Sequence, residues 1–162
     1  DDSDESSSGS DSFAAGSSTG KAAYEKALTL TSKNSVWKAS YQNVDPFNES
    51  GTVYGTCSQL VYWAYKHCGV TLGSDSSHTT WVISGLSNVT TVGSKGSNKN
   101  SVYNKIEEGD MVFFDTEGSD THIAIAGRNN LVGFNSSGLR TFNLKSNSYW
   151  WGAFKGHVVR AK

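Results

Sequence analysis

The sequence is poor in several features that commonly define a class of protein. Among its 162 residues, no run approaches the roughly 20 consecutive apolar residues of a membrane-spanning helix, so no membrane span is predicted. The four histidines and two cysteines form no pair at the close spacing of metal ligands, and neither a metal nor any other cofactor is predicted. Any chemistry must therefore come from the side chains themselves.

The two cysteines are not placed to form a disulfide with each other. Cys57 and Cys68 lie on one predicted helix, eleven residues apart, which corresponds to about 16 Å along a helix axis. Cα atoms that are joined through a disulfide lie within about 7 Å of each other. Both thiols are therefore expected to be free, with Cys68 a small buried residue near the end of the helix.

Charge is low and unevenly distributed along the chain. The formal net charge is -1, so nucleic acid is not an expected partner. Five of the 15 acidic residues fall in the first twenty positions, which contain no Lys or Arg. The remaining chain carries 14 basic and 10 acidic side chains, a mildly basic balance that suits an anionic surface such as a bacterial wall.

The chain divides into a short N-terminal segment and one domain. Residues 1–19 are mostly Ser, Asp and Gly with almost nothing to bury, and this composition predicts a disordered linker. Residues 20–162 are numerous enough to form one domain with an ordinary core. The linker implies that this domain is attached to other domains of a longer parent chain.

Helix signals come first along the domain, and strand signals follow. Residues 21–30 and 57–67 have the apolar spacing of helices, and Gly69 is expected to end the second one. The aromatic-rich stretch 34–55 is expected to be irregular. Strands are predicted at 111–114, 122–126, 131–135, 139–142, 149–154 and 158–160. This order predicts an α+β fold, with N-terminal helices packed on a C-terminal antiparallel sheet of about five to six strands.

The most reactive arrangement in the sequence is a cysteine that opens a helix and a later histidine that opens a strand. A helix N-terminus or a nearby imidazolium lowers the pKa of a thiol from about 8.5 by up to several units. We therefore expect Cys57 to be a thiolate nucleophile, with His122 as its general base. The plainer alternatives are a buried structural thiol and a histidine at the edge of a sheet.

The residues around this pair resemble a known family. The resemblance is carried by three runs in order: Thr56-Cys57-Ser58-Gln59-Leu60-Val61, Gly109-Asp110-Met111-Val112-Phe113-Phe114 and His122-Ile123-Ala124-Ile125. They are similar to the Asp-Cys-Ser-Gly-Leu/Phe-Val, Gly-Asp-Leu-Val-Phe-Phe and His-Val-Gly-Ile runs of the NlpC family of cell-wall cysteine peptidases. The resemblance covers residues 20–162 and implies a papain-like, NlpC-type fold with Cys57 and His122 as the catalytic pair.

Three positions depart from the family pattern. Thr56 stands where the family has an acid before the cysteine, Gln59 where it has a glycine, and Ser35 where it has a tyrosine. In the family, that acid, that tyrosine and the serine after the cysteine, here Ser58, help to hold the free amine of the L-Ala-D-Glu end. We therefore expect the nucleophile to be kept and the substrate preference to differ.

The third catalytic residue, which orients the imidazole, is marked less clearly. The family has it on the strand after the histidine strand, and the aligned positions here are Gly133 and Phe134, whose side chains have no group to orient a ring. Because side chains alternate along a strand, Asn135 shares a face with Gly133. Asn135 is the polar candidate for this position.

The predicted substrate site lies around the nucleophile. Trp37 and Tyr54, in the preceding loop, are expected to line the cleft, and Thr56 and Ser58 flank Cys57. The resemblance implies a secreted or wall-located thiol protease, a monomer, that degrades peptidoglycan by cutting stem peptides at the bond between D-Glu and the diamino acid. Two alternatives stay open: a CHAP-like amidase that cuts between muramic acid and L-Ala, and a catalytically silent wall-binding module.

Overall fold

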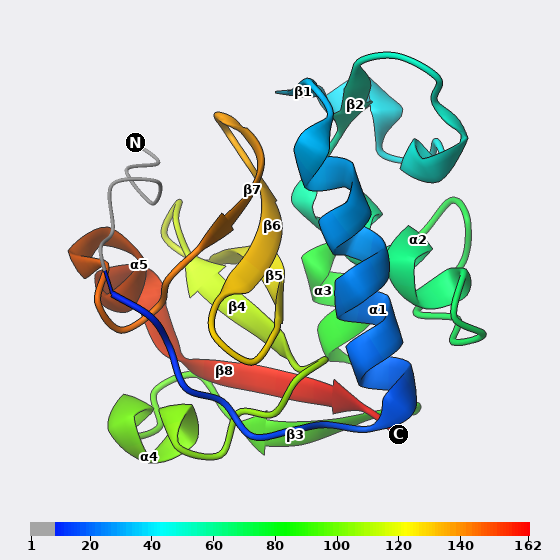
Figure 1. Ribbon diagram of the computed structural model, residues 1–162. Helices are drawn as coiled ribbons and strands as arrows, with labels where there is room; N and C mark the ends of the chain where they lie inside the picture. Colours follow the sequence, from blue (N-terminus) through cyan, green and yellow to red (C-terminus); the bar gives the residue numbers. More distant parts are fainter. Residues whose placement is uncertain (1–8) are drawn as a thin grey trace.

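A computed structural model describes residues 9–162 and confirms the α+β fold (Figure 1). Its main sheet has six antiparallel strands in the order β3-β8-β4-β5-β6-β7. These strands are β3 (Val89–Gly93), β4 (Met111–Asp115), β5 (Asp120–Ala126), β6 (Leu131–Asn135), β7 (Gly138–Phe142) and β8 (Phe154–Ala161). A second, parallel sheet joins β1 (Ser35–Trp37) to β2 (Val53–Gly55).

Helices cover both faces of the main sheet. The α-helices are α1 (Ser18–Leu28), α2 (Cys57–Lys66), α3 (Thr80–Ser84), α4 (Lys99–Tyr103) and α5 (Ser148–Ala153), and the 3-10 helices are η2 (Thr29–Ser32), η3 (Ala39–Tyr41) and η4 (Pro46–Asn48). In Figure 1, α1 and α2 lie together on one side of the sheet, whereas α4 and α5 lie on the other. Within residues 9–162, no helix has the length and apolar character that crossing a membrane requires.

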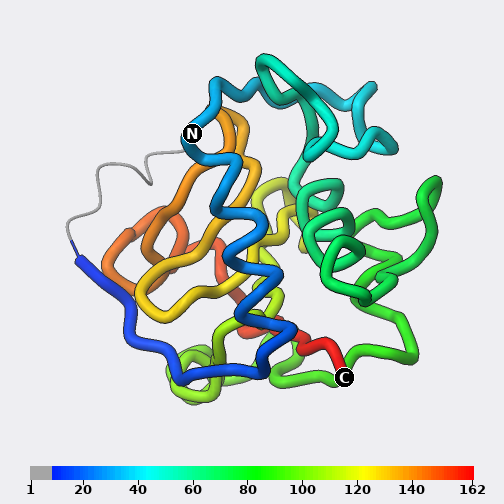
Figure 2. Tube along the Cα trace, turned by 45° about the vertical axis from the view of Figure 1, so that its right-hand side comes forward, coloured from blue at the N-terminus to red at the C-terminus, as the bar shows by residue number. Residues whose placement is uncertain are grey.

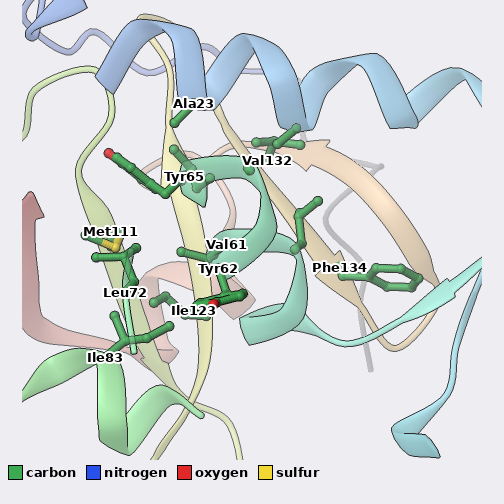
Figure 3. Packing of buried hydrophobic residues seen from close by; sticks show 14 of the residues in the cluster. Ala23, Val61, Tyr62, Tyr65, Leu72, Ile83, Met111, Ile123, Val132 and Phe134 are labelled. Atoms are coloured by element: carbon green, nitrogen blue, oxygen red, sulfur yellow. The ribbon is translucent and has the colours of Figure 1, made fainter. Parts of the chain in front are cut away.

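Alternation along the strands divides their side chains between two cores. In β5, Ile123 and Ile125 pack with α1 and α2, whereas Ala124 and Ala126 pack with α4 and α5. Figure 3 shows Val61 of α2 beside Ile123 in the first of these cores. Burial on both faces explains why the central strands have nearly continuous apolar sequences.

The predicted disordered linker over residues 1–19 is wrong for the part that the structure describes. Residues 1–8 of that prediction lie outside the described chain, but the following segment packs along the domain before it enters α1, as Figure 2 shows in dark blue. The Phe13 ring is buried against Tyr103. The buried Asp11 carboxylate accepts hydrogen bonds from two backbone N–H groups, at 2.7 and 3.1 Å, and from the Tyr103 hydroxyl at 2.8 Å. A polar anchor of this kind is not visible in the composition of the segment.

Two further segments differ from the sequence-based expectation. Residues 149–154 are predicted as a strand but belong mostly to α5, because the Asn147 side chain caps that helix. Its Oδ1 accepts hydrogen bonds from the N–H groups of Tyr149 and Trp150, at 3.0 and 3.2 Å. The aromatic content that favours a strand is outweighed by this cap. The stretch 34–55, expected to be irregular, contains β1 and β2.

The Gly109-Asp110 run joins the sheet to the helices. Gly109 has a φ of +97°, and a Cβ there would lie 2.3 Å from the Gly20 Cα, so a larger residue would collide with α1. Asp110 is buried and accepts hydrogen bonds from Arg160 at 2.7 and 2.9 Å and from the Glu107 N–H at 2.8 Å. Burial raises the pKa of Asp110, while Arg160 and the Glu107 N–H act to lower it. Gly109 and Asp110, which belong to the second run of the family resemblance, therefore have a structural role.

The Asp11 anchor predicts a clear loss of stability on mutation. Asp11→Ala should lower the free energy of unfolding by about 2–4 kcal/mol, because three donors lose their charged acceptor. For a domain of this size, that corresponds to a Tm lower by roughly 5–15 °C. Thermal unfolding followed by circular dichroism measures the shift, with Ser12→Ala, at an exposed position of the same segment, as the control. Equal Tm values for the two variants would show that the Asp11 carboxylate contributes nothing to stability.

Candidate active site

The first turn of α2 places the candidate nucleophile. Thr56 is the N-cap residue, and its Oγ1 accepts a hydrogen bond from the Gln59 backbone N–H at 3.2 Å. In return, the Gln59 Oε1 accepts a hydrogen bond from the Thr56 N–H at 3.1 Å. This reciprocal capping box starts the helix at Cys57. Gln59, which departs from the family glycine, therefore has a structural function.

Cys57 and His122 line one cleft of about 570 Å³. The Cys57 sulfur lies 3.7 Å from the carbonyl oxygen of Thr121, and the backbone N–H of Ile123 donates a hydrogen bond to it. The sulfur therefore contacts the backbone on both sides of His122. Packing of α2 against β5 brings these two residues together across a long sequence separation.

Aromatic rings hold the imidazole of His122. The His122 side chain is almost buried, and its ring stacks on Trp150 with centroids 5.1 Å apart and planes 29° apart. Phe114 lies on β4 with its ring centroid 5.8 Å from the imidazole. Sequence reasoning missed Trp150 as a site residue because it assigned this segment to a strand. The run of aromatic residues Tyr149-Trp150-Trp151 is the feature of the sequence that could have indicated Trp150.

The predicted low pKa of the Cys57 thiol is wrong for the unliganded protein. Burial raises its pKa to about 11, because a thiolate in the cleft would lose its hydration. The backbone N–H groups of Ile123, Ser58 and Cys57 act to lower it, whereas the Glu117 carboxylate acts to raise it. The N–H groups at the helix start thus lower the pKa of the thiol, as expected, but desolvation raises it by more. With this pKa the thiol is protonated at neutral pH, so a nucleophilic role would require it to lose its proton during attack.

Asn135 lies on the strand next to that of His122. β5 and β6 pair with Ile125 opposite Val132. If this register is continued by three residues, toward the start of β5 and the end of β6, Asn135 falls opposite His122, on the same face of the sheet. Asn135 is buried at this position. The placement suits a residue that orients the imidazole, and this role stays a prediction.

Three of the four predicted substrate-binding residues line the cleft, and one does not. Trp37, Thr56 and Ser58 are lining residues, and Trp37 is 46% exposed. Tyr54 is not among them, because its ring packs on Tyr41 with centroids 5.1 Å apart. The sequence shows that this loop is aromatic, but only the tertiary structure decides which rings face the cleft.

Gln42 is a site residue that the sequence does not indicate. Its Nε2 donates a hydrogen bond to the Ser58 hydroxyl at 2.8 Å, and its Oε1 accepts one from the Thr56 hydroxyl. One neutral amide therefore binds hydroxyl groups on both sides of Cys57. Behind it, the buried ring of His78 contacts the Gln42 carbonyl oxygen, with Nε2 at 2.8 Å. No local pattern marks Gln42, because 14 and 16 residues separate it from its two hydroxyl partners.

The cleft surface is mostly neutral and rich in hydroxyl groups. Among the described residues that line it, Glu117 is the one carboxylate. Five threonines line it: Thr56, Thr79, Thr80, Thr116 and Thr121. Within residues 9–162, no group of three or more His, Cys, Asp or Glu side chains could hold a metal ion. Such a surface suits hydrogen bonding to neutral peptide and sugar groups.

Comparison with known proteins agrees with this arrangement. The model of the NlpC/P60 family matches residues 48–159. A curated relative, the peptidoglycan DL-endopeptidase CwlO of Bacillus licheniformis, is 33% identical over 105 residues. The match covers 64% of this chain and 20% of the relative, so the chain spans about one fifth of the length of that protein.

Two solved structures share the fold at low sequence identity. One is a Staphylococcus aureus Mu50 protein described as similar to a lipoprotein of the NLP/P60 family, with a TM-score of 0.60 and 18% identity. Its match covers 93% of this chain and 43% of that protein. The other is NlpC1 from Trichomonas vaginalis, with a TM-score of 0.54, 16% identity and coverage of 90% and 45%. These matches agree with the α+β fold described above.

The raised pKa predicts how the Cys57 thiol reacts in the free protein. Alkylation by iodoacetamide should be slow at pH 7, because the reactive thiolate forms only as the pH approaches a midpoint near 11. Below that midpoint, the rate should rise by about tenfold per pH unit. A Cys68→Ser variant makes Cys57 the single thiol, and mass spectrometry after timed labelling gives the rate. A midpoint below pH 8 would mean that the thiolate is already formed in the resting protein.

Proposed function

Since the chain belongs to the NlpC/P60 family, we propose that it is a peptidoglycan hydrolase. It acts as a cysteine endopeptidase that cuts an amide bond of the stem peptide. The observation that carries the proposal is the contact of the Cys57 sulfur with the backbone on both sides of His122 inside one cleft. The name of the curated relative, a peptidoglycan DL-endopeptidase, favours this activity over that of an amidase. The family resemblance supports a cut between D-Glu and the diamino acid, at the cell wall.

The reaction proceeds through an acyl-enzyme. The Cys57 sulfur attacks the amide carbon while its proton passes to His122, and a tetrahedral oxyanion forms. The C–N bond then breaks as His122 returns the proton to the leaving amine, and a thioester stays on Cys57. Water, deprotonated by His122, hydrolyses the thioester. The Cys57 N–H, in the first turn of α2, stabilises the oxyanion, and Asn135 orients the imidazole.

Next to the nucleophile, the cleft offers neutral groups to the substrate. The Thr56 and Ser58 hydroxyls and the Gln42 amide are joined by hydrogen bonds, and no carboxylate belongs to this group. A hydrogen bond between neutral groups is roughly half as strong as one assisted by charge. The protein therefore does not depend on the free amine of an N-terminal L-Ala, and it accepts stem peptides that are still attached to glycan.

Loss of the nucleophile should abolish hydrolysis. Cys57→Ala is expected to reduce the release of muropeptides from sacculi by at least about 10³-fold, and His122→Ala by a similar factor, whereas Asn135→Ala should cost less. Mass spectrometry of the digest identifies the new termini and so the bond that is cut. Circular dichroism verifies that each variant is folded.

Several outcomes would contradict this assignment. Hydrolysis by Cys57→Ala at the wild-type rate would exclude Cys57 as the nucleophile. New N-terminal L-Ala, with muramic acid residues in the glycan that have lost their stem peptide, would identify an amidase. A folded wild-type protein that binds sacculi and releases nothing would be a silent wall-binding module.

The neutral group next to Cys57 predicts tolerance of a blocked amine. The tripeptide L-Ala-D-Glu-diamino acid and its N-acetylated form should be cleaved with kcat/KM values within about threefold of each other. Gln42→Glu places a carboxylate between Thr56 and Ser58, and it should favour the free amine by about tenfold or more. Gln42→Ala, which removes the amide without adding charge, is the control. A strong preference of the wild-type protein for the free amine would show that another residue supplies the charge.

A further inference from the structure

A second pocket, of about 340 Å³, adjoins the cleft. Thr80 and Thr121 line both spaces, so a ligand in the second pocket lies directly beside the cleft. The pocket lies near the beginning of β5, where Asp120 precedes His122 by two residues. The reaction described above uses none of the residues that belong to this pocket alone.

Trp81 forms the exposed wall of this pocket. It is 85% exposed, more than any other large hydrophobic side chain in residues 9–162. The exposure follows from how α3 docks: Ile83, two positions later and so on the opposite side of the helix, is completely buried. Because Ile83 packs α3 onto the protein, the indole of Trp81 points into solvent. An exposed aromatic ring that lines a pocket gives it an apolar face on which a ligand can pack.

Other residues that line the pocket carry polar groups with fixed partners. The His157 ring stacks on Phe113, with centroids 4.2 Å apart and planes 14° apart, and its Nδ1 lies 2.7 Å from an Asp120 carboxylate oxygen. The Lys95 ammonium lies 3.2 Å from an Asp115 carboxylate oxygen and 4.0 Å from the other oxygen of Asp120, and its side chain is 47% exposed. The pocket thus combines one aromatic face with fixed donors and acceptors.

This combination matches the chemistry of a sugar. A pyranose ring has an apolar face of C–H groups, which packs on an aromatic ring, and a rim of hydroxyl groups, which pair with charged and polar side chains. A ligand site of this kind needs an apolar wall and a few placed polar groups. We propose that this pocket is a saccharide subsite that holds a sugar ring of the glycan strand, while the attached stem peptide occupies the cleft. This inference rests on the proposed function, because it assigns the second pocket to another part of the same substrate.

Direct binding tests the subsite without hydrolysis. Chitotetraose, a soluble oligomer of N-acetylglucosamine, should bind to the Cys57→Ala protein in isothermal titration calorimetry. Adding Trp81→Ala should weaken this binding at least tenfold, and adding Lys95→Ala should weaken it by a smaller factor. Val44→Ala, which truncates another exposed hydrophobic side chain, is the control and should leave binding unchanged. Absence of chitotetraose binding, or equal binding with and without Trp81, would overturn the proposal.

Kinetics of the active protein give a second readout. For Trp81→Ala, the ratio of kcat/KM for a disaccharide-linked tripeptide to that for the free tripeptide should fall about tenfold. An unchanged ratio would overturn the subsite and leave the proposed hydrolase intact. Conversely, Trp81-dependent binding of chitotetraose by a wild-type protein that cuts no peptidoglycan would support the subsite and contradict the hydrolase.

Discussion

The site depends on the packing of α2 across β5 and β6. Val61 and its apolar neighbours on α2 fill the space beside Ile123 and Val132 (Figure 3). Removal of this apolar surface from water stabilises the fold, and the same contact sets the beginning of α2 beside the beginning of β5. Cys57 and His122 meet as a consequence of this core packing, together with the cap that starts the helix at Cys57.

The burial that builds the cleft also opposes the charge that its chemistry needs. Three backbone N–H groups surround the Cys57 sulfur, yet loss of hydration still raises the pKa of the thiol. A protonated thiol is protected from oxidants and alkylating agents, since the thiolate is the reactive form. The proposed reaction therefore needs a base at close range, and the rings of Trp150 and Phe114 pack on the imidazole of His122, the residue proposed for that role.

In the function proposed above, substrate recognition relies on neutral and aromatic groups more than on charge. Gln42 joins the hydroxyls that flank the nucleophile, and Trp37 and Trp81 present exposed rings at the cleft and at the pocket beside it. Peptidoglycan offers amides and sugar rings, which such surfaces recognise. The N-terminal segment lies away from this site. Asp11 binds it to Tyr103, on the face of the sheet opposite α2.

The sequence by itself determined the features that depend on neighbouring residues. The start of the helix at Cys57, the strands at 111–114, 122–126, 131–135 and 139–142, and the α+β class all follow from local periodicity and turn residues. Only the tertiary structure decided which groups meet: the bonds of Gln42, the anchor at Asp11 and the direction of the Cys57 pKa shift. These depend on contacts between residues far apart in the chain and on how much water the folded cleft excludes, and no local pattern encodes either.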